Sequence, residues 1–412
     1  MPGRWLERGT SSYDELMLLG RRSALGVLAG AGAWVIGCSE SDNNDGSSGT
    51  GIASSPALCR GIEGGAFVRT VPFEGEGPAA LDVPIGAGLD GRLYDDLSTL
   101  EIGAPTTPTS RFYIRTRYPD RLDPNAPWKI RVHGLVERET TLTLDDLAPS
   151  IGPRGVHLLE CSGNGGGAFF GMLSAAEWEG TPLLALLDAK APRTSNATRV
   201  LVSGFDDHSQ PSARSVPGAS WIFTRAELEA TGAFLATRMN GEVLPPDHGF
   251  PVRLVVPGWY GCTCIKWVNE IALVGDDEPS TPHMREFASR TMQSGTPDLA
   301  RDFAPAAIDQ TAMPVRVEEW RVGDRRVYRI IGVAWGGSRP TSALAVRMNA
   351  DLPFERVAFC APPTTNATWS WWAHAFAAPR AGLYTMRLRV EEAGIRTRRL
   401  DSGFYARTVA LA

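Results

Sequence analysis

The chain of 412 residues is poor in lysine and has no surplus of positive charge. Lys129, Lys190 and Lys266 are its only lysines, so arginine supplies the remaining fixed positive charge, and the formal net charge is −5. Because nucleic-acid partners require a basic surface, we expect no such partner. The apolar run at 24–36 is rich in glycine and alanine and is shorter than the ~20 residues that cross a bilayer comfortably.

The remaining composition is that of an ordinary globular protein, with 43% hydrophobic and 21% charged residues. A chain of this length can bury a sizeable core and form two domains. No internal repeat of the length that builds solenoids is visible in the sequence.

The first forty residues have the features of a targeting segment. Arg21-Arg22 precede the run 24–36, and paired arginines before a weakly apolar run are typical of a twin-arginine export signal. An ordinary secretory signal or a chance arginine pair is the alternative. Residues 35–38 resemble a lipobox in which Cys38 becomes the lipidated first residue, and an incidental cysteine is the alternative. We therefore predict a signal at 1–38, a flexible tether at 39–60 and a periplasmic protein with a membrane tether through Cys38.

An exported compartment permits disulfides, but the sequence alone does not show which cysteines pair. Four further cysteines are available: Cys59, Cys262, Cys264 and Cys360. One intervening residue rarely allows an unstrained bridge. We therefore expect Cys262 and Cys264 to be reduced or separately placed thiols, with a second metal site as a minor alternative.

The hydrophobic patterns divide the chain into two kinds of structure. Between 106 and 300, short strands such as 128–132 alternate with helix starts, such as an N-cap at Thr181 before Pro182 and a capping box at 224–227. This alternation is typical of an α+β domain. At 384–390, apolar and polar residues alternate with a period of two. We predict an immunoglobulin-like sandwich at 312–412 and an irregular N-terminal wrap at 61–105.

The stretch 157–167, HLLECSGNGGG, continues a short apolar strand at 156–159 into a glycine-rich turn. Such a turn holds one side chain rigidly and lets a large ligand approach the backbone. The side chain at the corner is Cys161, and a cysteine thiolate is a soft metal ligand. A small buried hydrophobe is the alternative, as most free cysteines are.

Residues 160–165, Glu-Cys-Ser-Gly-Asn-Gly, resemble the molybdenum-ligand loop of the sulfite oxidase family, in particular its bacterial sulfane-dehydrogenase-like members. The likeness extends from Thr106 to Arg407. It implies a sulfite oxidase-type molybdopterin-binding domain at 106–300 and a homodimer formed through the β domain. It also implies molybdenum-molybdopterin as the cofactor, with Cys161 as the metal ligand.

Several further motifs match the family pattern. Residues 113–117, Tyr-Ile-Arg-Thr-Arg, resemble an aromatic-X-Arg-X-His segment, with arginine in place of histidine at the end. Residues 247–254 are a near-complete family signature, and Lys266-Trp267 matches a Lys-Trp pair. The resemblance implies cofactor contacts from Tyr113, Arg115, Arg117, Asp206, His248, Arg253, Cys264, Ile265 and Lys266, and catalytic roles for Cys161, Arg115 and Trp178. Solvated surface arginines and a turn aspartate are the alternatives.

The substrate positions depart from those of sulfite oxidases proper. Gly166 falls where they have a second arginine, and Thr237 where a tyrosine usually precedes the Met-Asn-Gly turn. Each charged contact to a small dianion is worth ~1.5–3 kcal/mol, so sulfite is a doubtful substrate. Arg238 restoring the charge, or a larger or neutral substrate, are the open alternatives.

The resemblance implies oxygen-atom transfer at molybdenum, with oxidation of a small sulfur compound as the leading hypothesis. The sequence contains no Cys-X-X-Cys-His haem motif. Electrons would therefore pass to a separate carrier, in the family typically a c-type cytochrome. Reduction of an oxide such as a sulfoxide on the same cofactor, or a non-catalytic exported binding lipoprotein, are the alternatives.

Overall fold

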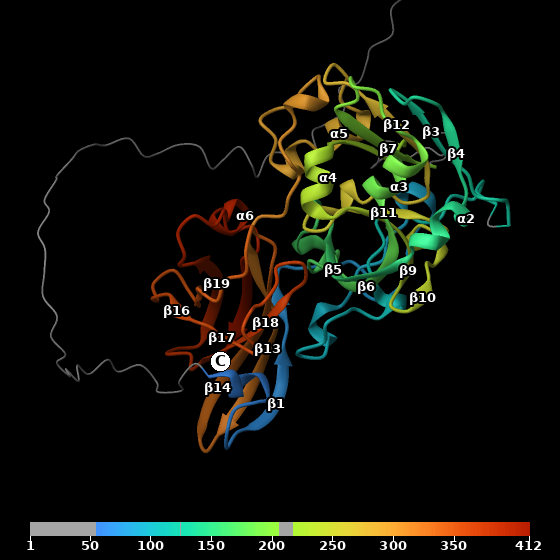
Figure 1. Cartoon of the computed structure of the whole chain (residues 1–412). Helices are drawn as coiled ribbons and strands as arrows, with labels where there is room; N and C mark the ends of the chain where they lie inside the picture. Colours follow the sequence, from blue (N-terminus) through green and yellow to red (C-terminus); the bar gives the residue numbers. More distant parts are fainter. Residues whose placement is uncertain (1–54, 124, 206–216) are drawn as a thin grey trace, which may run out of the picture. The chain divides into compact units, whose positions relative to one another are not determined.

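The computed structural model describes residues 55–412 except residue 124 and residues 206–216. All of them belong to one unit that extends over residues 50–412. The described chain is mostly strand with short helices (Figure 1), so helix is the minor partner in the predicted α+β class. The predicted signal at 1–38, the lipid site at Cys38 and the cofactor residue Asp206 lie outside the described residues.

Two five-stranded antiparallel sheets, which we call the C-terminal sheet pair, share one apolar core. Their orders are β1-β13-β14-β18-β17 and β16-β15-β19-β20-β2. The predicted alternation in β19 is confirmed, because Tyr384, Met386 and Leu388 are buried and the residues between them are exposed. The strands are β1 (Ala66–Val71), β2 (Phe73–Glu74), β13 (Thr311–Val322), β14 (Arg325–Trp335), β15 (Leu344–Arg347), β16 (Glu355–Arg356), β17 (Ala358–Phe359), β18 (Ser370–Phe376), β19 (Gly382–Val390) and β20 (Arg407–Leu411).

Two further five-stranded sheets form the part of the chain that contains the cysteine loop. One has the order β10-β9-β6-β5 with β11 paired to β9, and the other has the order β4-β3-β12-β7-β8. Within them only the β3–β12 pair is parallel among the described strands. The strands are β3 (Ile130–Gly134), β4 (Thr140–Leu142), β5 (Gly152–Glu160), β6 (Leu173–Pro182), β7 (Arg199–Gly204), β8 (Ser220–Thr224), β9 (Phe234–Met239), β10 (Glu242–Val243), β11 (Arg253–Val255) and β12 (Val268–Val274).

The helices connect these strands and are short. The predicted capping box is present at the start of α4, where the Thr224 hydroxyl accepts from the Glu227 amide and the Glu227 carboxylate accepts from the Thr224 amide. The predicted N-cap at Thr181 is wrong, because β6 continues through Pro182 and the Thr181 hydroxyl donates to the carbonyl of Leu147 instead. The α-helices are α2 (Leu144–Leu147), α3 (Leu183–Lys190), α4 (Arg225–Thr231), α5 (Pro282–Glu286) and α6 (Arg398–Asp401). The 3-10 helices are η1 (Pro56–Cys59), η2 (Gly88–Asp90), η3 (Leu97–Thr99), η4 (Thr109–Arg111), η5 (Ala148–Ser150), η6 (Gly166–Ala168), η7 (Pro246–His248), η8 (Gly261–Thr263), η9 (Ser289–Thr291) and η10 (Ala300–Asp302).

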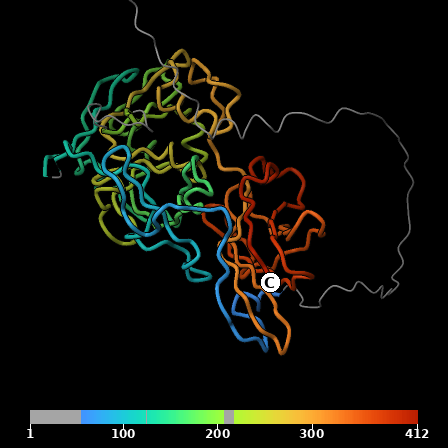
Figure 2. Tube along the Cα trace, turned by 180° about the vertical axis from the view of Figure 1, so that it is seen from behind, coloured from blue at the N-terminus to red at the C-terminus, as the bar shows by residue number. Residues whose placement is uncertain are grey.

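The N-terminal region is more regular than we predicted. The irregular wrap expected at 61–105 begins with β1, which pairs with β13, and Figure 2 shows this blue strand beside the orange strands. The tether expected at 39–60 is also too long, because its last residues form η1 and Cys59 makes a disulfide with Cys360. The N-terminal segment is therefore fastened to the C-terminal sheet pair by both pairing and a covalent bond.

Cys262 and Cys264 are buried free thiols, as expected. Among the described residues, no helix combines the length and the apolar character that crossing a membrane would need.

Candidate functional site

A cavity of about 850 Å³, its open mouth included, contains most of the residues singled out in the sequence. It is lined by residues from the segments 112–116, 247–253, 261–267 and 283–287, together with Leu89, Cys161 and Ala219.

Cys161 reaches the cavity from the turn that follows β5 and is 3% exposed. Its amide donates to the Met172 carbonyl at 3.0 Å, and its carbonyl accepts from the Asn164 amide at 2.9 Å. The Asn164 side chain closes the turn, because its Oδ1 accepts from the Met172 amide at 3.0 Å. The thiol is therefore presented by a turn that backbone and side-chain hydrogen bonds hold in one conformation.

Arg253 forms a buried cationic part of the wall. Its Nη1 donates to the His248 carbonyl at 3.1 Å, and its Nη2 donates to the Cys264 carbonyl at 3.2 Å. The guanidinium also lies over the Trp178 ring, 5.3 Å from its centre. Its buried Nε has no hydrogen-bond partner among the described residues, so one donor remains for a ligand.

Lys266, in the 261–267 segment, is a second cation of the wall. Its Nζ donates to the carbonyls of Asp247 and Thr116, which ties together three segments of the wall. Gly249 makes this packing possible: its φ of +110° suits glycine, and a Cβ there would lie 2.9 Å from the Cβ of Arg253 and 3.3 Å from that of Lys266.

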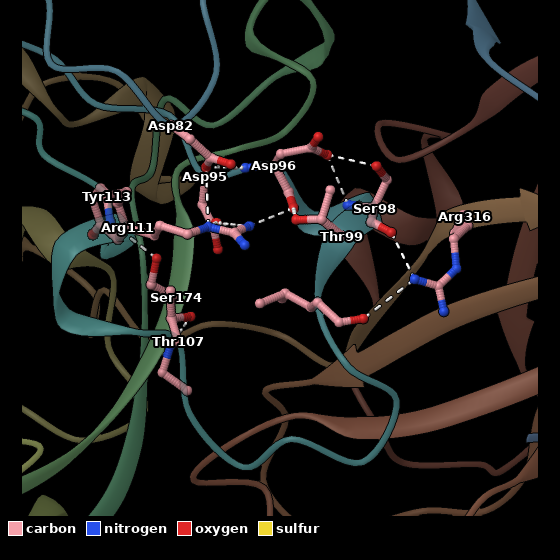
Figure 3. A network of polar contacts seen from close by, with 12 residues as sticks. Asp82, Asp95, Asp96, Ser98, Thr99, Thr107, Arg111, Tyr113, Ser174 and Arg316 are labelled. Atoms are coloured by element: carbon pink, nitrogen blue, oxygen red, sulfur yellow. Dashed lines mark hydrogen bonds and ion pairs between the residues drawn. The ribbon is translucent and has the colours of Figure 1, made fainter. Parts of the chain in front are cut away.

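Tyr113 and Arg115 reach the cavity from an extended segment that Figure 3 shows anchored by a polar network. The Tyr113 amide donates to the Ser174 hydroxyl at 3.0 Å, and Arg111 forms an ion pair with the fully buried Asp95 at 2.6 Å. These contacts fix the segment at residues 111 and 113 against residue 95 and β6, so the Tyr113 side chain has a defined position in the cavity.

Burial sets the protonation states around the cavity. Desolvation, reinforced by Lys266 and Arg253, lowers the pKa of His248 to about 3, so this imidazole is neutral near pH 7. Burial likewise raises the pKa of Cys262 well above its usual range, and it raises the pKa of Cys264. These two cysteines are therefore protonated thiols near pH 7.

Three residues predicted or considered for the site lie elsewhere. Trp178 is fully buried and does not line the cavity; it supports Arg253 from behind. Arg117 lies outside the lining and pairs with Asp247 at 3.2 Å. Arg238 cannot restore the missing substrate charge from its observed position, because it pairs with Glu179 at 3.3 Å outside the lining.

One part of the cavity wall was not predicted from the sequence. His283, Glu286 and Phe287, on or beside α5, line the cavity. Burial and then Arg115 lower the pKa of His283 to about 4, so it is neutral near pH 7. Thr281 caps this helix and Pro282 begins it, a start signal readable in the sequence, but nothing local indicates that the helix faces Cys161.

The donor set fits a large anionic cofactor rather than a bare metal. Among the described residues, no group of three or more histidine, cysteine and acidic side chains could hold a metal ion. A metal at Cys161 would therefore need its other ligands from a bound cofactor. The buried Arg253, with its unused Nε, and the half-buried Lys266 would suit the phosphate and polar ring of molybdopterin.

Comparisons with known proteins agree with this assignment. Residues 116–282 match the oxidoreductase molybdopterin binding domain. Mitochondrial sulfite oxidase of Macaca fascicularis is 29% identical over 269 residues, which are 60% of this chain and 48% of that protein. The NADPH nitrate reductase of Phytophthora infestans is 29% identical over 320 residues, 68% of this chain and 35% of that enzyme. The chain thus spans about half the length, or less, of these curated relatives.

A solved structure shows the same fold. The sulfane dehydrogenase SoxCD of Paracoccus pantotrophus superposes with a TM-score of 0.56 at 20% identity, covering 74% of this chain and 78% of that one. The matched domain implies a molybdenum-molybdopterin cofactor. The matched domain and the sulfite oxidase and nitrate reductase relatives support a molybdenum cofactor-dependent oxidoreductase that is similar to the sulfite oxidase family.

Proposed function

We propose that the chain is a periplasmic enzyme that oxidises a sulfur compound by oxygen-atom transfer and gives the electrons to a separate carrier. The observation that supports this most is that the Cys161 thiol and three cationic side chains, Arg115, Arg253 and Lys266, line one cavity. A thiol beside several cations suits a thiolate-ligated metal with an anionic organic ligand.

Each wall has a separate task in this proposal. Arg253 and Lys266 bind the anionic part of the cofactor, and Cys161 supplies the thiolate ligand. The bound molybdenum cofactor supplies the two-electron chemistry and the oxygen-atom transfer. Arg115 and the neutral imidazole of His283 orient the substrate by donating hydrogen bonds to its oxygens.

The substrate is proposed to be larger or less charged than sulfite. Gly166, at the position of a second arginine in sulfite oxidases, lies outside the cavity lining, and Arg238 is paired elsewhere. One charged contact fewer weakens binding of a small dianion by ~1.5–3 kcal/mol, about 10- to 150-fold. A mediator-coupled panel of sulfite, other sulfur oxyanions, sulfanes and sulfoxides tests this, and a preference for sulfite would contradict it.

The remaining features complete the proposal. Export through the twin-arginine pathway, lipid attachment at Cys38 and an immunoglobulin-like, dimer-forming C-terminal sheet pair are consistent with a folded, cofactor-loaded periplasmic protein. A c-type cytochrome is the proposed electron acceptor, because the sequence has no haem-attachment motif of its own. Fractionation, mass spectrometry of the mature N-terminus and light scattering test location, lipid and dimer in turn.

Cys161→Ser is the decisive variant, with Cys262→Ser as its matched control because both thiols line the cavity. Protein matured in a molybdenum-replete host should contain about one molybdenum and one pterin per chain. Cys161→Ser should lose turnover and the thiolate-to-metal absorption, whereas Cys262→Ser should keep both. A metal-free wild-type protein would refute the proposal. Turnover only with oxidised substrates, such as sulfoxides, would favour the alternative function of an oxide reductase. No turnover with any substrate would favour the non-catalytic binding lipoprotein.

A further inference from the structure

Glu160, the residue before Cys161, has a fully buried carboxylate that the proposed chemistry does not use. Its Oε2 accepts a hydrogen bond from the Trp335 indole at 2.9 Å, and its Oε1 accepts one from the Tyr405 hydroxyl. The Arg399 guanidinium lies 3.6 Å from Oε1 and donates to the Tyr405 hydroxyl at 3.2 Å. All three partners come from the part of the chain that forms the C-terminal sheet pair.

The local backbone connects this carboxylate with the thiol. Successive side chains at the end of a strand point to opposite sides, so Glu160 contacts the C-terminal sheet pair while Cys161 lines the cavity. Arg399 also donates to the carbonyl of Ser162 at 2.6 Å. The residues on both sides of Cys161 are therefore held by one buried group of side chains.

Arg399 also contacts two segments next to other parts of the cavity lining. It donates to the carbonyl of Arg290 at 2.7 Å, shortly after the α5 segment that contributes His283 and Phe287 to the lining. Its guanidinium lies 4.6 Å from the centre of the Tyr260 ring. Tyr260 is the residue before Gly261, which lines the cavity. A planar guanidinium with five donors can fix several backbone segments at once.

We propose that Glu160 is a positioning residue that, through Trp335, Tyr405 and Arg399, fixes where the Cys161 sulfur lies in the cavity. A buried carboxylate with several charged or polar donors has one favourable orientation, and such networks are rigid when all members are satisfied. Only the catalytic consequence rests on the proposed function, because the position of the sulfur is a property of the protein itself.

Two variants test the network. Glu160→Gln keeps the side-chain volume and removes the charge that faces Arg399, and Tyr405→Phe removes one hydrogen bond and keeps that charge. Glu318→Gln is the matched control, because Glu318 is also buried and accepts from the Trp320 indole and from Arg329, both at 2.8 Å, within β13 and β14.

The first measurement uses full-length protein prepared without cofactor. The rate at which iodoacetamide alkylates Cys161 is followed by peptide mass spectrometry, with Cys262 of the same cavity as the internal reference. Glu160→Gln and Tyr405→Phe should change the Cys161 rate relative to Cys262 by about fivefold or more, whereas Glu318→Gln should stay within about twofold.

The second measurement uses molybdenum-loaded protein. Glu160→Gln should shift the thiolate-to-molybdenum absorption and lower kcat by about tenfold or more, with KM within about twofold, because substrate contacts are unchanged and the ligand is displaced. Glu318→Gln should leave the spectrum and kcat as in the wild type.

The outcomes separate this inference from the proposed function. Alkylation rates equal to wild type in both network variants would overturn the inference, whether or not the protein binds molybdenum. Wild-type protein without molybdenum would overturn the proposed function, and the alkylation rates would still decide the inference. If Glu160→Gln fails to fold, Tyr405→Phe alone decides, since it keeps the buried charge pair.

Discussion

Replacing Arg253 tests whether its buried guanidinium serves the fold or the cofactor. Arg253→Met keeps much of the aliphatic stem and removes the two donors that bind the carbonyls of His248 and Cys264 at 3.1 and 3.2 Å. Arg253→Lys keeps the charge but not the planar fork that reaches both carbonyls.

Two opposing effects act on the cofactor-free Arg253→Met protein. Each carbonyl that loses its donor costs ~1–3 kcal/mol, whereas removing a buried charge recovers a desolvation cost of several kcal/mol. Desolvation is the larger effect in the native protein, because burial lowers the pKa of Arg253 despite the nearby Cys264 and Tyr113. We therefore expect the free energy of unfolding to change by no more than about 2 kcal/mol.

Cofactor binding should change much more. Losing one charge-assisted contact to an anionic group costs ~1.5–3 kcal/mol, which weakens binding about 10- to 150-fold. Molybdenum per chain, measured by mass spectrometry after growth at limiting molybdate, should fall steeply in Arg253→Met and less in Arg253→Lys. Chemical denaturation of the cofactor-free proteins measures the change in the free energy of unfolding.

Arg199→Met is the matched control, because Arg199 is mostly buried on β7 and pairs with Asp276 away from the cavity lining. It should keep the wild-type molybdenum content. Full molybdenum content in Arg253→Met at limiting molybdate would refute the role of Arg253 in cofactor binding. A loss of more than about 4 kcal/mol of stability would refute the energy balance.

Three further predictions concern stability. Cys59→Ser opens the bridge to Cys360 across 301 residues and should lower the free energy of unfolding by about 2–5 kcal/mol, and reduced wild type should match it. Burial lowers the pKa of His374 from 6.5 to about 4, so its stabilising contribution is complete above about pH 6.5 and is lost as pH falls towards 4. His374→Leu should therefore flatten the pH dependence of stability in that window by up to about 1.4 kcal/mol per pH unit, measured by denaturation at pH 5 and 7. Gly249→Ala, at φ +110° and against Arg253, should cost about 1–3 kcal/mol and lower molybdenum content; unchanged values of both would contradict the packing argument.

The sequence predicted those fold features that local patterns determine. The capping box at Thr224 and the alternation at 384–390 depend only on neighbouring residues, and both are present. The strand β1 could not be read in the same way, because five of its six residues are exposed and show no period of two. Its conformation depends on pairing with β13, about 250 residues further along the chain, which no local pattern reports.

The same distinction applies to the site. The predicted residues that line the cavity come from dense motifs: Tyr113, Arg115, Cys161, His248, Arg253, Cys264, Ile265 and Lys266. The α5 wall and the partners of Glu160 were missed because they come from single residues far along the chain. Trp335 and Tyr405 lie 175 and 245 residues after Glu160. The sequence around each of them is ordinary for a packed sheet and does not indicate a contact with Glu160.

Trp178 shows where a motif match gives a residue but not its role. The indole has no exposed surface, donates to the His157 carbonyl at 3.2 Å and lies beneath the Arg253 guanidinium. A ring fixed in this way stabilises the cation by a few kcal/mol at most, yet it also prevents the guanidinium from withdrawing from the cavity. The tryptophan is therefore expected to act on the proposed cofactor site through Arg253, because the indole itself does not line the cavity.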